Sequence, residues 1–241
     1  MDRSAWHQFL EEIEEAQAGL SSSGAAWYRG HSNAAWSLMP GLFRINGGLE
    51  AEARAFHEFR RSAARLFEKH SSDWEMLFDM QHHGIPTRLL DWTENLGVAI
   101  AFVLHTDYGH KTDSAVFVLD PLALNRLSGI QEVKQLPGDA GFDYQNIYFR
   151  KQPFAPVRPI AVVPPLHSAR LFAQRGTFTI HGDTDQALEA QCPNAVRKVI
   201  LPLAARDAAW EFLQHAALDE YTIYPDIVGM ARHIRRKVFD V

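Results

Sequence analysis

Residues Gln81 to Thr93 carry the densest set of reactive side chains in the chain. The segment reads Gln-His-His-Gly-Ile-Pro-Thr-Arg-Leu-Leu-Asp-Trp-Thr, and an apolar helical pattern follows it. It offers acid–base groups in His82 and Asp91, a guanidinium in Arg88 and a hydroxyl in Thr87. Buried polar side chains need partners. We therefore expect these groups either to form a network or to line a cleft.

Two interpretations of this segment compete. In the first, a phosphorylated ligand binds to Arg88, Thr93 and the backbone N–H groups of the helix after Thr93, where the helix dipole favours anions. In the second, Asp91 pairs with Arg88 and Thr93 is only the helix N-cap. We favour the first interpretation. The adjacent His82 and His83 lack the i, i+4 spacing of metal ligands on a helix, so we expect no metal.

A second candidate segment is Trp27-Tyr28-Arg29-Gly30-His31. An arginine at the end of a predicted strand presents a planar fork of donors that suits a phosphate or a carboxylate. The glycine after it would let a ligand approach the backbone closely. The alternative is a structural arginine paired with an acid, and these five residues do not decide between the two.

A third segment, Ser168 to Ile180, predicts a helix that leads into a strand. Arg170 and Gln174 are four residues apart and so share one face of that helix. Gly176 is expected to end the helix. Gln174 can orient a ligand but is weak as a base. On its own, this pattern is typical of an ordinary helix-to-strand junction.

The composition sets limits on the class of protein. The chain has 241 residues, 46% hydrophobic and 22% charged, which is typical of a globular protein. Its net charge of -5 gives no overall basic field to attract nucleic acid. The single cysteine, Cys192, allows no intramolecular disulfide, and we find neither a signal peptide nor an apolar stretch that could cross a bilayer. We expect a cytoplasmic protein without membrane contact.

The helices and strands predicted from the sequence position these segments and together indicate one α+β domain over residues 1–241, with a core at about 20–235. Its sheet is expected to be small, mixed or antiparallel, and flanked by several helices. Residues 129–159 contain several prolines, and we interpret them as an insert or a lid. Predicted strands cover 25–29, 115–119, 160–163, 177–181 and 198–201, and the main predicted helices cover 4–20, 49–69, 73–81, 98–105, 204–217 and 226–239.

Taken together, these segments resemble the FRG domain family, which is named for a Phe/Tyr-Arg-Gly signature. Tyr28-Arg29-Gly30 is similar to that signature, and Gln81 to Thr93, continued by Val98 to Phe102, is similar to the second block of the family. His83 departs from this block, where an aromatic residue is usual. Arg170-x-x-x-Gln174-x-Gly176-x-Phe178 resembles the third block, and residues 223–229 resemble the closing block. The resemblance runs from about residue 20 to 235.

The resemblance implies a function. FRG domains are similar in distribution to bacterial and phage conflict modules, which implies a toxin or a phage-defence effector. The order of signals also resembles the ADP-ribosyltransferase plan and implies a similar fold. In that plan an arginine contacts NAD, a hydroxyl orients the ribose and a glutamate assists cleavage. Arg29 matches the first position and Thr87 or Thr93 the second, but Gln174 stands where a glutamate is expected.

Our leading hypothesis is a protein that binds NAD or a related nucleotide. A catalytic version would transfer ADP-ribose to a protein or nucleic-acid target, or hydrolyse the nicotinamide bond. His82 is the candidate proton-transfer group and Asp91 the candidate carboxylate beside the developing positive charge. The candidate catalytic residues are Arg29, His82, Asp91 and Gln174; the candidate ligand-binding residues are Tyr28, Gly30, His31, Gln81, Thr87, Arg88, Trp92, Thr93, Arg170 and Gly176.

Two rival hypotheses remain open. One is a nuclease or other phosphoryl-transfer enzyme that uses His82 and Arg88 on a phosphodiester. The other is a non-catalytic sensor domain that binds a ligand or a partner. The missing glutamate favours the sensor.

Overall fold

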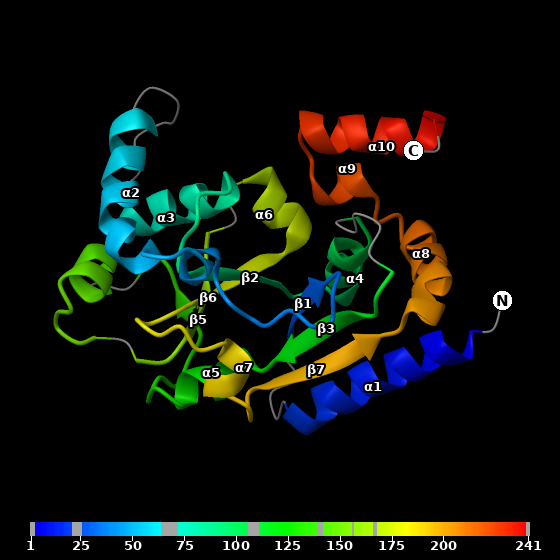
Figure 1. Ribbon diagram of the computed structural model, residues 1–241, viewed down its shortest axis with the longest axis horizontal. Helices are drawn as coiled ribbons and strands as arrows, with labels where there is room; N and C mark the ends of the chain where they lie inside the picture. Colours follow the sequence, from blue (N-terminus) through cyan, green and yellow to red (C-terminus); the bar gives the residue numbers. More distant parts are fainter. Residues whose placement is uncertain are drawn as a thin grey trace.

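The computed structural model describes residues 3–20, 26–63, 72–105, 111–138, 142–155, 157–165 and 168–239. The described strands form one seven-stranded sheet in the order β4-β5-β6-β2-β1-β3-β7 (Figure 1). All neighbouring strands are antiparallel except β4 and β5. This is the α+β class that the sequence predicts. The strands are β1 Trp27–His31, β2 Leu89–Thr93, β3 Ser114–Leu119, β4 Lys134–Gln135, β5 Ile160–Val163, β6 Gly176–Ile180 and β7 Val196–Leu201.

Several helices begin where the sequence supplies a capping side chain. Ser72, Asp120, Ser168 and Asp219 each accept a hydrogen bond from a backbone N–H of the first turn. The helices are α1 Ser4–Leu20, α2 Gly48–Ala63, α3 Asp73–His82, α4 Leu96–His105, α5 Pro121–Arg126, α6 Ala169–Gln174, α7 Leu188–Gln191, α8 Arg206–His215, α9 Glu220–Ile223 and α10 Ile227–Phe239. None of the helices within the described ranges is long and apolar enough to cross a membrane.

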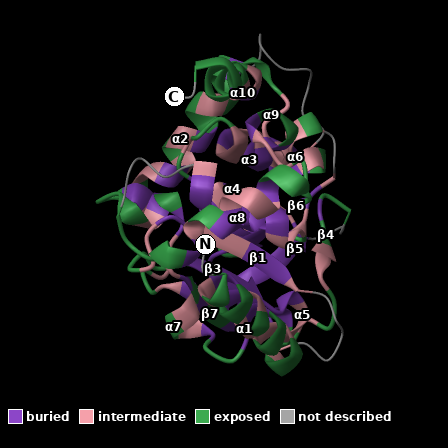
Figure 2. Cartoon of the chain, turned by 90° about the vertical axis from the view of Figure 1, so that its right-hand side faces the viewer, coloured by how far each residue is buried: buried purple, intermediate pink, exposed green. Residues whose placement is uncertain are grey.

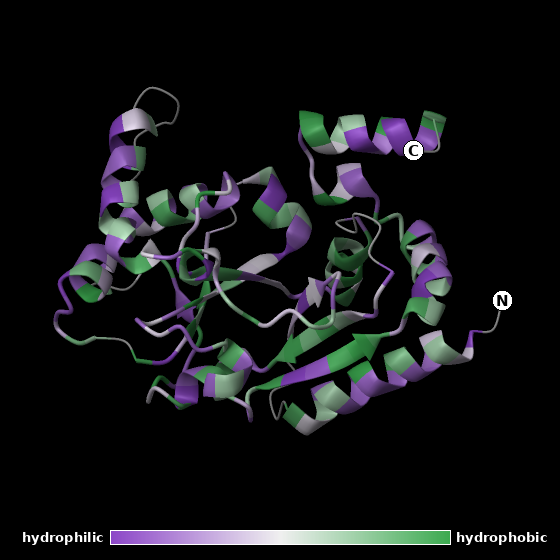
Figure 3. Cartoon of the chain, viewed as in Figure 1, coloured by the Kyte–Doolittle hydropathy of each residue, from purple (hydrophilic) through white to green (hydrophobic). Residues whose placement is uncertain are grey.

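Three apolar clusters hold the helices on the sheet. One packs α1, α4 and α8 against β1, β3 and β7, and a second packs α2 and α3 against β2, β5 and β6. The third lies on the other face of the sheet under α5 and α7. Figure 2 shows the central strands and α4 largely buried, whereas α10 is exposed along most of its length. Figure 3 shows the matching concentration of hydrophobic residues on α4 and β3.

The sheet separates between β1 and β2. β1 pairs with β3 at five positions and β2 pairs with β6 at five, but in the described strands β1 and β2 pair only at Tyr28 and Thr93. The two strands therefore diverge beyond this point. The gap lies beside the two segments that carry the strongest sequence signals.

Two sequence-based expectations need correction. The predicted strands omit residues 89–93, but these residues form the central strand β2. Asn95 caps α4 by accepting hydrogen bonds from two backbone N–H groups, so Thr93 is not the N-cap. Within residues 129–159, which the sequence predicts as an insert or a lid, Tyr144, Ile147 and Tyr148 lie in the core cluster under α2 and α3.

Two other expectations are only partly visible. The helix predicted to reach residue 69 is described as far as Ala63, and residues 64–69 lie outside the described residues. Residue 25, the predicted start of the first strand, also lies outside them.

Candidate ligand-binding pocket

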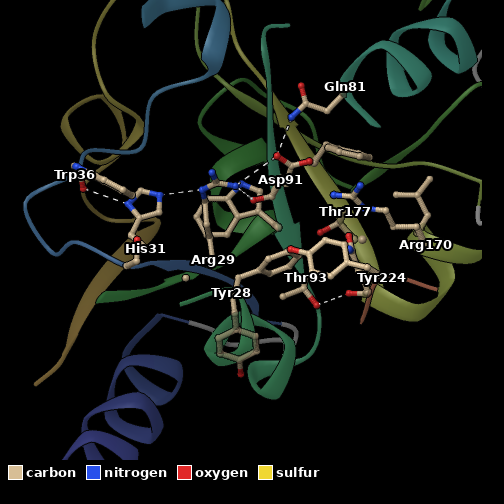
Figure 4. A pocket seen from close by; sticks show the side chains of 18 of the residues that line it. Tyr28, Arg29, His31, Trp36, Gln81, Asp91, Thr93, Arg170, Thr177 and Tyr224 are labelled. Carbon is tan, nitrogen blue, oxygen red and sulfur yellow. Dashed lines mark hydrogen bonds and ion pairs between the residues drawn. The ribbon is translucent and has the colours of Figure 1, made fainter. Parts of the chain in front are cut away.

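A cavity of about 340 Å³ lies where β1 and β2 separate (Figure 4). This volume is at the lower end of the range for small-molecule sites, roughly 300–1,000 Å³. Most of the wall comes from segments that the sequence singles out. The lining residues are Tyr28, Arg29, Gly30, His31, Ser32, Trp36, Arg44, Gln81, Asp91, Trp92, Thr93, Phe102, Arg170, Leu171, Gln174, Gly176, Thr177, Phe178 and Tyr224.

Arg29 connects the two strands that border the cavity. Its Nε donates to Nε2 of His31 at 3.0 Å, and its Nη1 donates to the backbone oxygen of Asp91 at 2.7 Å. Nη1 also lies 3.6 Å from Oδ2 of Asp91. Burial lowers the pKa of Arg29, and the charge of Asp91 opposes this effect. Arg29 therefore has a structural role across the gap, whichever ligand binds there.

His31 is a neutral acceptor in this arrangement. Burial, followed by the positive charge of Arg29, lowers the pKa of His31 to about 3. Because Nε2 accepts from Arg29, the ring proton belongs on Nδ1, which lies 3.3 Å from the backbone oxygen of Trp36. His31 thus orients Arg29 and is poorly suited to act as a general acid near neutral pH.

A chain of hydrogen bonds fixes Asp91, whose side chain is 51% exposed. Nε2 of Gln81 donates to Oδ2 of Asp91 at 2.8 Å, and Oε1 of Gln81 accepts from the hydroxyl of Thr87 at 2.6 Å. The Thr87 hydroxyl in turn accepts from the backbone N–H of Leu89. Within the described chain, Asp91 is the one carboxylate on the cavity wall.

Gln174 and Thr93 join the cavity wall to its supporting helices. The hydroxyl of Thr93 donates to the backbone oxygen of Gln174 at 2.6 Å and accepts from the backbone N–H of Asn95. The side-chain nitrogen of Gln174 donates to the backbone oxygen of Ile223 at 3.1 Å. Both side chains line the cavity, but these bonds give them a positioning role in the fold.

Positive charge exceeds negative charge on the cavity wall. Arg29, Arg44 and Arg170 face one carboxylate, that of Asp91. Figure 4 shows Arg29 and Arg170 extending from different segments into the same pocket. Charged groups in a concave site attract ligands of opposite sign. The wall is therefore complementary to an anion.

Aromatic rings provide much of the remaining wall. Trp36, Trp92, Phe102, Phe178 and Tyr224 all line the cavity. Such flat apolar surfaces suit the stacking of a ring on the ligand. Tyr28 contributes its ring, but its hydroxyl points away from the cavity and accepts a hydrogen bond from Gln17 on α1 (Figure 4).

The structure brings together all of the predicted site residues except His82, Thr87 and Arg88. Arg88 is buried among α2, β6 and the π-turn at Gln145–Phe149, with a side chain only 1% exposed. It forms an ion pair with Glu52 and donates to the backbone oxygen of His181 at 2.8 Å. The interpretation of Arg88 as a phosphate ligand is therefore not supported by its position, because a partner from within the fold occupies its guanidinium.

His82 lies at the end of α3, outside the cavity wall. Burial, then the charges of Arg170 and His83, lower its pKa.

Gly30 differs from the expectation that it lets a ligand approach the backbone, since a Cβ atom there would lie 2.1 Å from the backbone oxygen of Ala99. The glycine is thus required by the close approach of α4, and its missing side chain does not make room for a ligand.

Sequence reasoning missed five residues on the wall that carry functional groups: Ser32, Trp36, Arg44, Thr177 and Tyr224. Trp36 and Arg44 belong to a stretch without a regular pattern. Thr177 and Tyr224 stand inside the third and closing blocks of the resemblance. A threonine directly after Gly176 was a usable signal, because strand alternation places it on one defined face.

No group of three or more His, Cys, Asp or Glu side chains suited to a metal occurs in the described ranges.

The fold and the pocket define the class of protein as an α+β protein with an arginine-rich cavity between two diverging strands. The FRG domain model matches residues 24–112 of this chain. The match includes both Tyr28-Arg29-Gly30 and Gln81 to Thr93, whereas the two later blocks lie beyond it. Searches of the curated proteins and of the solved structures found no match.

Proposed function

We propose that this protein binds NAD or a related nucleotide in the cavity between β1 and β2. The observation that carries the proposal is the excess of three arginines over one carboxylate on a wall that is otherwise rich in aromatic rings. Arginine suits phosphate because its fork of donors matches phosphate oxygens, and aromatic rings suit a base or nicotinamide. The volume of about 340 Å³ fits part of a dinucleotide better than all of it.

A second proposal concerns chemistry on that ligand. Cleavage of the nicotinamide bond develops positive charge on the ribose, which a carboxylate stabilises. Asp91 is the carboxylate available on the described wall, and Gln81 holds it at 2.8 Å. This supports NAD hydrolysis or ADP-ribose transfer assisted by Asp91, as expected for a toxin or phage-defence effector in the cytoplasm. A ligand-binding sensor without turnover is the alternative.

The nuclease hypothesis has less support. It requires Arg88 to contact a phosphodiester, but the side chain of Arg88 is 1% exposed and is paired with Glu52. His82, the other residue of that hypothesis, does not line the cavity.

Calorimetry with the purified protein tests nucleotide binding. Arg44 is an exposed arginine on the cavity wall, and Arg61 is an exposed arginine on α2 outside it. Arg44→Glu and Arg61→Glu change the net charge equally. We expect NAD and ADP-ribose to bind, Arg44→Glu to weaken them about tenfold, which corresponds to 1.4 kcal/mol, and Arg61→Glu to have little effect. Absence of binding, or equal loss in both variants, would contradict the proposal.

Release of nicotinamide from NAD tests the chemistry. Asp91→Asn keeps the size of the side chain and removes its charge. We expect this variant to bind NAD but to release nicotinamide at least a hundredfold more slowly. A wild-type protein that binds NAD without turnover would support the sensor and refute the role of Asp91. RNA or DNA cleavage that survives in Arg44→Glu would favour a separate nuclease site.

A further inference from the structure

The guanidinium of Arg170 is available to a ligand. In the described part of the chain it makes no hydrogen bond and no ion pair, although the guanidinium carbon lies 4.9 Å from the centre of the Tyr224 ring. Stacking on an aromatic face orients the planar group without using its N–H donors. Figure 4 shows the Arg170 guanidinium on the side of the pocket where Thr177 lies. Arg170 therefore presents an oriented fork of donors to the cavity.

The hydroxyl of Thr177 is a second unused group on that wall. The residue is 2% exposed, and its Oγ1 has no hydrogen-bond partner among the described residues. Its register partner on β2 is Trp92, so both side chains lie on one face of the sheet. A buried polar atom without a partner carries a free-energy cost. A ligand atom in the cavity would remove that cost.

Arg29 has fewer donors to offer. Its Nε is used by His31, and its Nη1 is used by the backbone of Asp91. Arg170 therefore has more N–H donors available to a ligand than Arg29, although the sequence signal is stronger at Arg29.

We propose that Arg170 and Thr177 together bind a phosphoryl group of the ligand, while Arg29 mainly holds the two strands of the cavity wall. This inference rests on the proposed nucleotide-binding function and names the part of the ligand that this end of the pocket takes. A guanidinium fork engages two oxygens of the group. A phosphoryl group still has a further oxygen for the hydroxyl of Thr177, which a carboxylate lacks. The chemistry therefore favours a phosphate ester, or free phosphate or pyrophosphate, over a carboxylic acid.

Matched ligands and variants test this assignment. AMP and adenosine differ only by the phosphoryl group, and inorganic pyrophosphate carries it without a base. Arg170→Gln removes the charge, Arg170→Lys keeps the charge but not the fork, and Thr177→Val removes only the hydroxyl. Arg29→Lys is the comparison variant, and Arg61→Gln on the exposed surface of α2 is the control.

We expect Arg170→Gln to weaken AMP binding about a hundredfold and Thr177→Val about tenfold, with adenosine nearly unchanged. Arg170→Lys should fall between wild type and Arg170→Gln. Arg29→Lys should weaken AMP and adenosine by similar factors, because it disturbs the whole wall. Thr177→Val should be at least as stable as wild type in urea denaturation, which separates a ligand role from a folding role.

The possible results separate this inference from the proposed function. If wild type binds nucleotides and Arg170→Gln binds AMP equally well, or loses AMP and adenosine alike, this inference is wrong and the proposed function stands. If wild type binds pyrophosphate through Arg170 but binds no nucleotide, the proposed function is wrong and the subsite stands. If wild type binds neither pyrophosphate nor a nucleotide, both are wrong.

Discussion

Replacement of Arg88 should test whether the most conspicuous segment of the sequence serves folding or binding. Arg88 and Glu52 form a buried ion pair with side chains 1% and 7% exposed. Nε of Arg88 donates to Oε1 of Glu52 at 2.7 Å, and the hydroxyl of Tyr144 donates to the same oxygen at 2.6 Å. The ring of Tyr148 lies 4.6 Å from the guanidinium carbon. Arg88 therefore joins α2, β2 and the π-turn in one network.

The expected magnitude follows from this burial. Arg88→Met keeps most of the side-chain volume but leaves the carboxylate of Glu52 buried without its cation. Breaking a buried pair in this way costs about 3–5 kcal/mol. It also leaves the backbone oxygen of His181 without the 2.8 Å hydrogen bond from Nη1. Since a domain is stable by only about 5–15 kcal/mol, the variant should be markedly less stable.

Urea denaturation of four proteins measures the effect: wild type, Arg88→Met, Glu52→Gln and the double variant. The double variant should be less destabilised than the sum of the single variants, because it does not leave one charge buried alone. The folded Arg88→Met protein should bind the ligand like wild type, since Arg88 does not line the cavity. A loss below about 1 kcal/mol, the value for an exposed pair, would refute the structural role. Lost binding without lost stability would restore the phosphate-ligand interpretation.

Three further predictions concern the walls of the pocket. Gly30→Ala should lower the free energy of unfolding by about 3 kcal/mol in urea denaturation, because the added methyl group would lie 2.1 Å from the backbone oxygen of Ala99. Thr93→Val should cost about 1–3 kcal/mol by removing two hydrogen bonds, and Thr93→Ser, which keeps them, should cost less; equal losses would contradict this. Burial lowers the pKa of both His31 and His181 to about 3. The unfolded chain binds these protons near pH 6.5, so the free energy of unfolding should fall as the pH drops from 6.5 toward 3, by up to about 1.4 kcal/mol per unit for each histidine. Imidazole NMR should find both rings neutral at pH 5, and protonated rings there would refute the prediction.

The sequence predicts elements best where local patterns are strong. The predicted helix at 98–105 and the predicted strand at 115–119 are apolar almost throughout, and the structure has them as Leu96–His105 and Ser114–Leu119, both buried. Asp120 caps the helix that starts at Pro121, and this combination of cap and first-turn proline is a local sequence signal. These features depend on neighbours in the chain, so a sequence contains enough information to place them.

Features that depend on distant partners were missed. Leu89–Thr93 is a strand because β6 pairs with it, for example Leu89 with Ile180, far along the chain. Its own residues do not alternate clearly, because Leu89 and Leu90 are buried on opposite faces. Arg88 is structural through Glu52 and the backbone oxygen of His181, which no local pattern links to it. The same limit applies to Thr177. Its proposed role rests on a buried hydroxyl without a hydrogen-bond partner, which no sequence pattern reveals.

The geometry of the sheet explains why the sequence signature around Arg29 and the cavity lie at the same place. Two antiparallel neighbours normally exchange backbone hydrogen bonds along their length. In the described strands β1 and β2 do so only around Tyr28 and Thr93, so the backbone of β2 at Asp91 lacks a strand partner on that side. Nη1 of Arg29 supplies a donor to that carbonyl oxygen at 2.7 Å.

A side chain that replaces missing strand pairing must be long, must donate several hydrogen bonds and must keep its charge when half-buried, and arginine meets all three conditions. The cavity beside this gap is lined by aromatic side chains and by more arginines than carboxylates. Arg29, conspicuous in the sequence, therefore holds the cavity wall, while the side chains of Arg170 and Thr177, which make no hydrogen bond within the described chain, are the groups that we propose contact the anion. The different roles of Arg29 on one side and of Arg170 and Thr177 on the other follow from the hydrogen bonds that each side chain already makes within the fold.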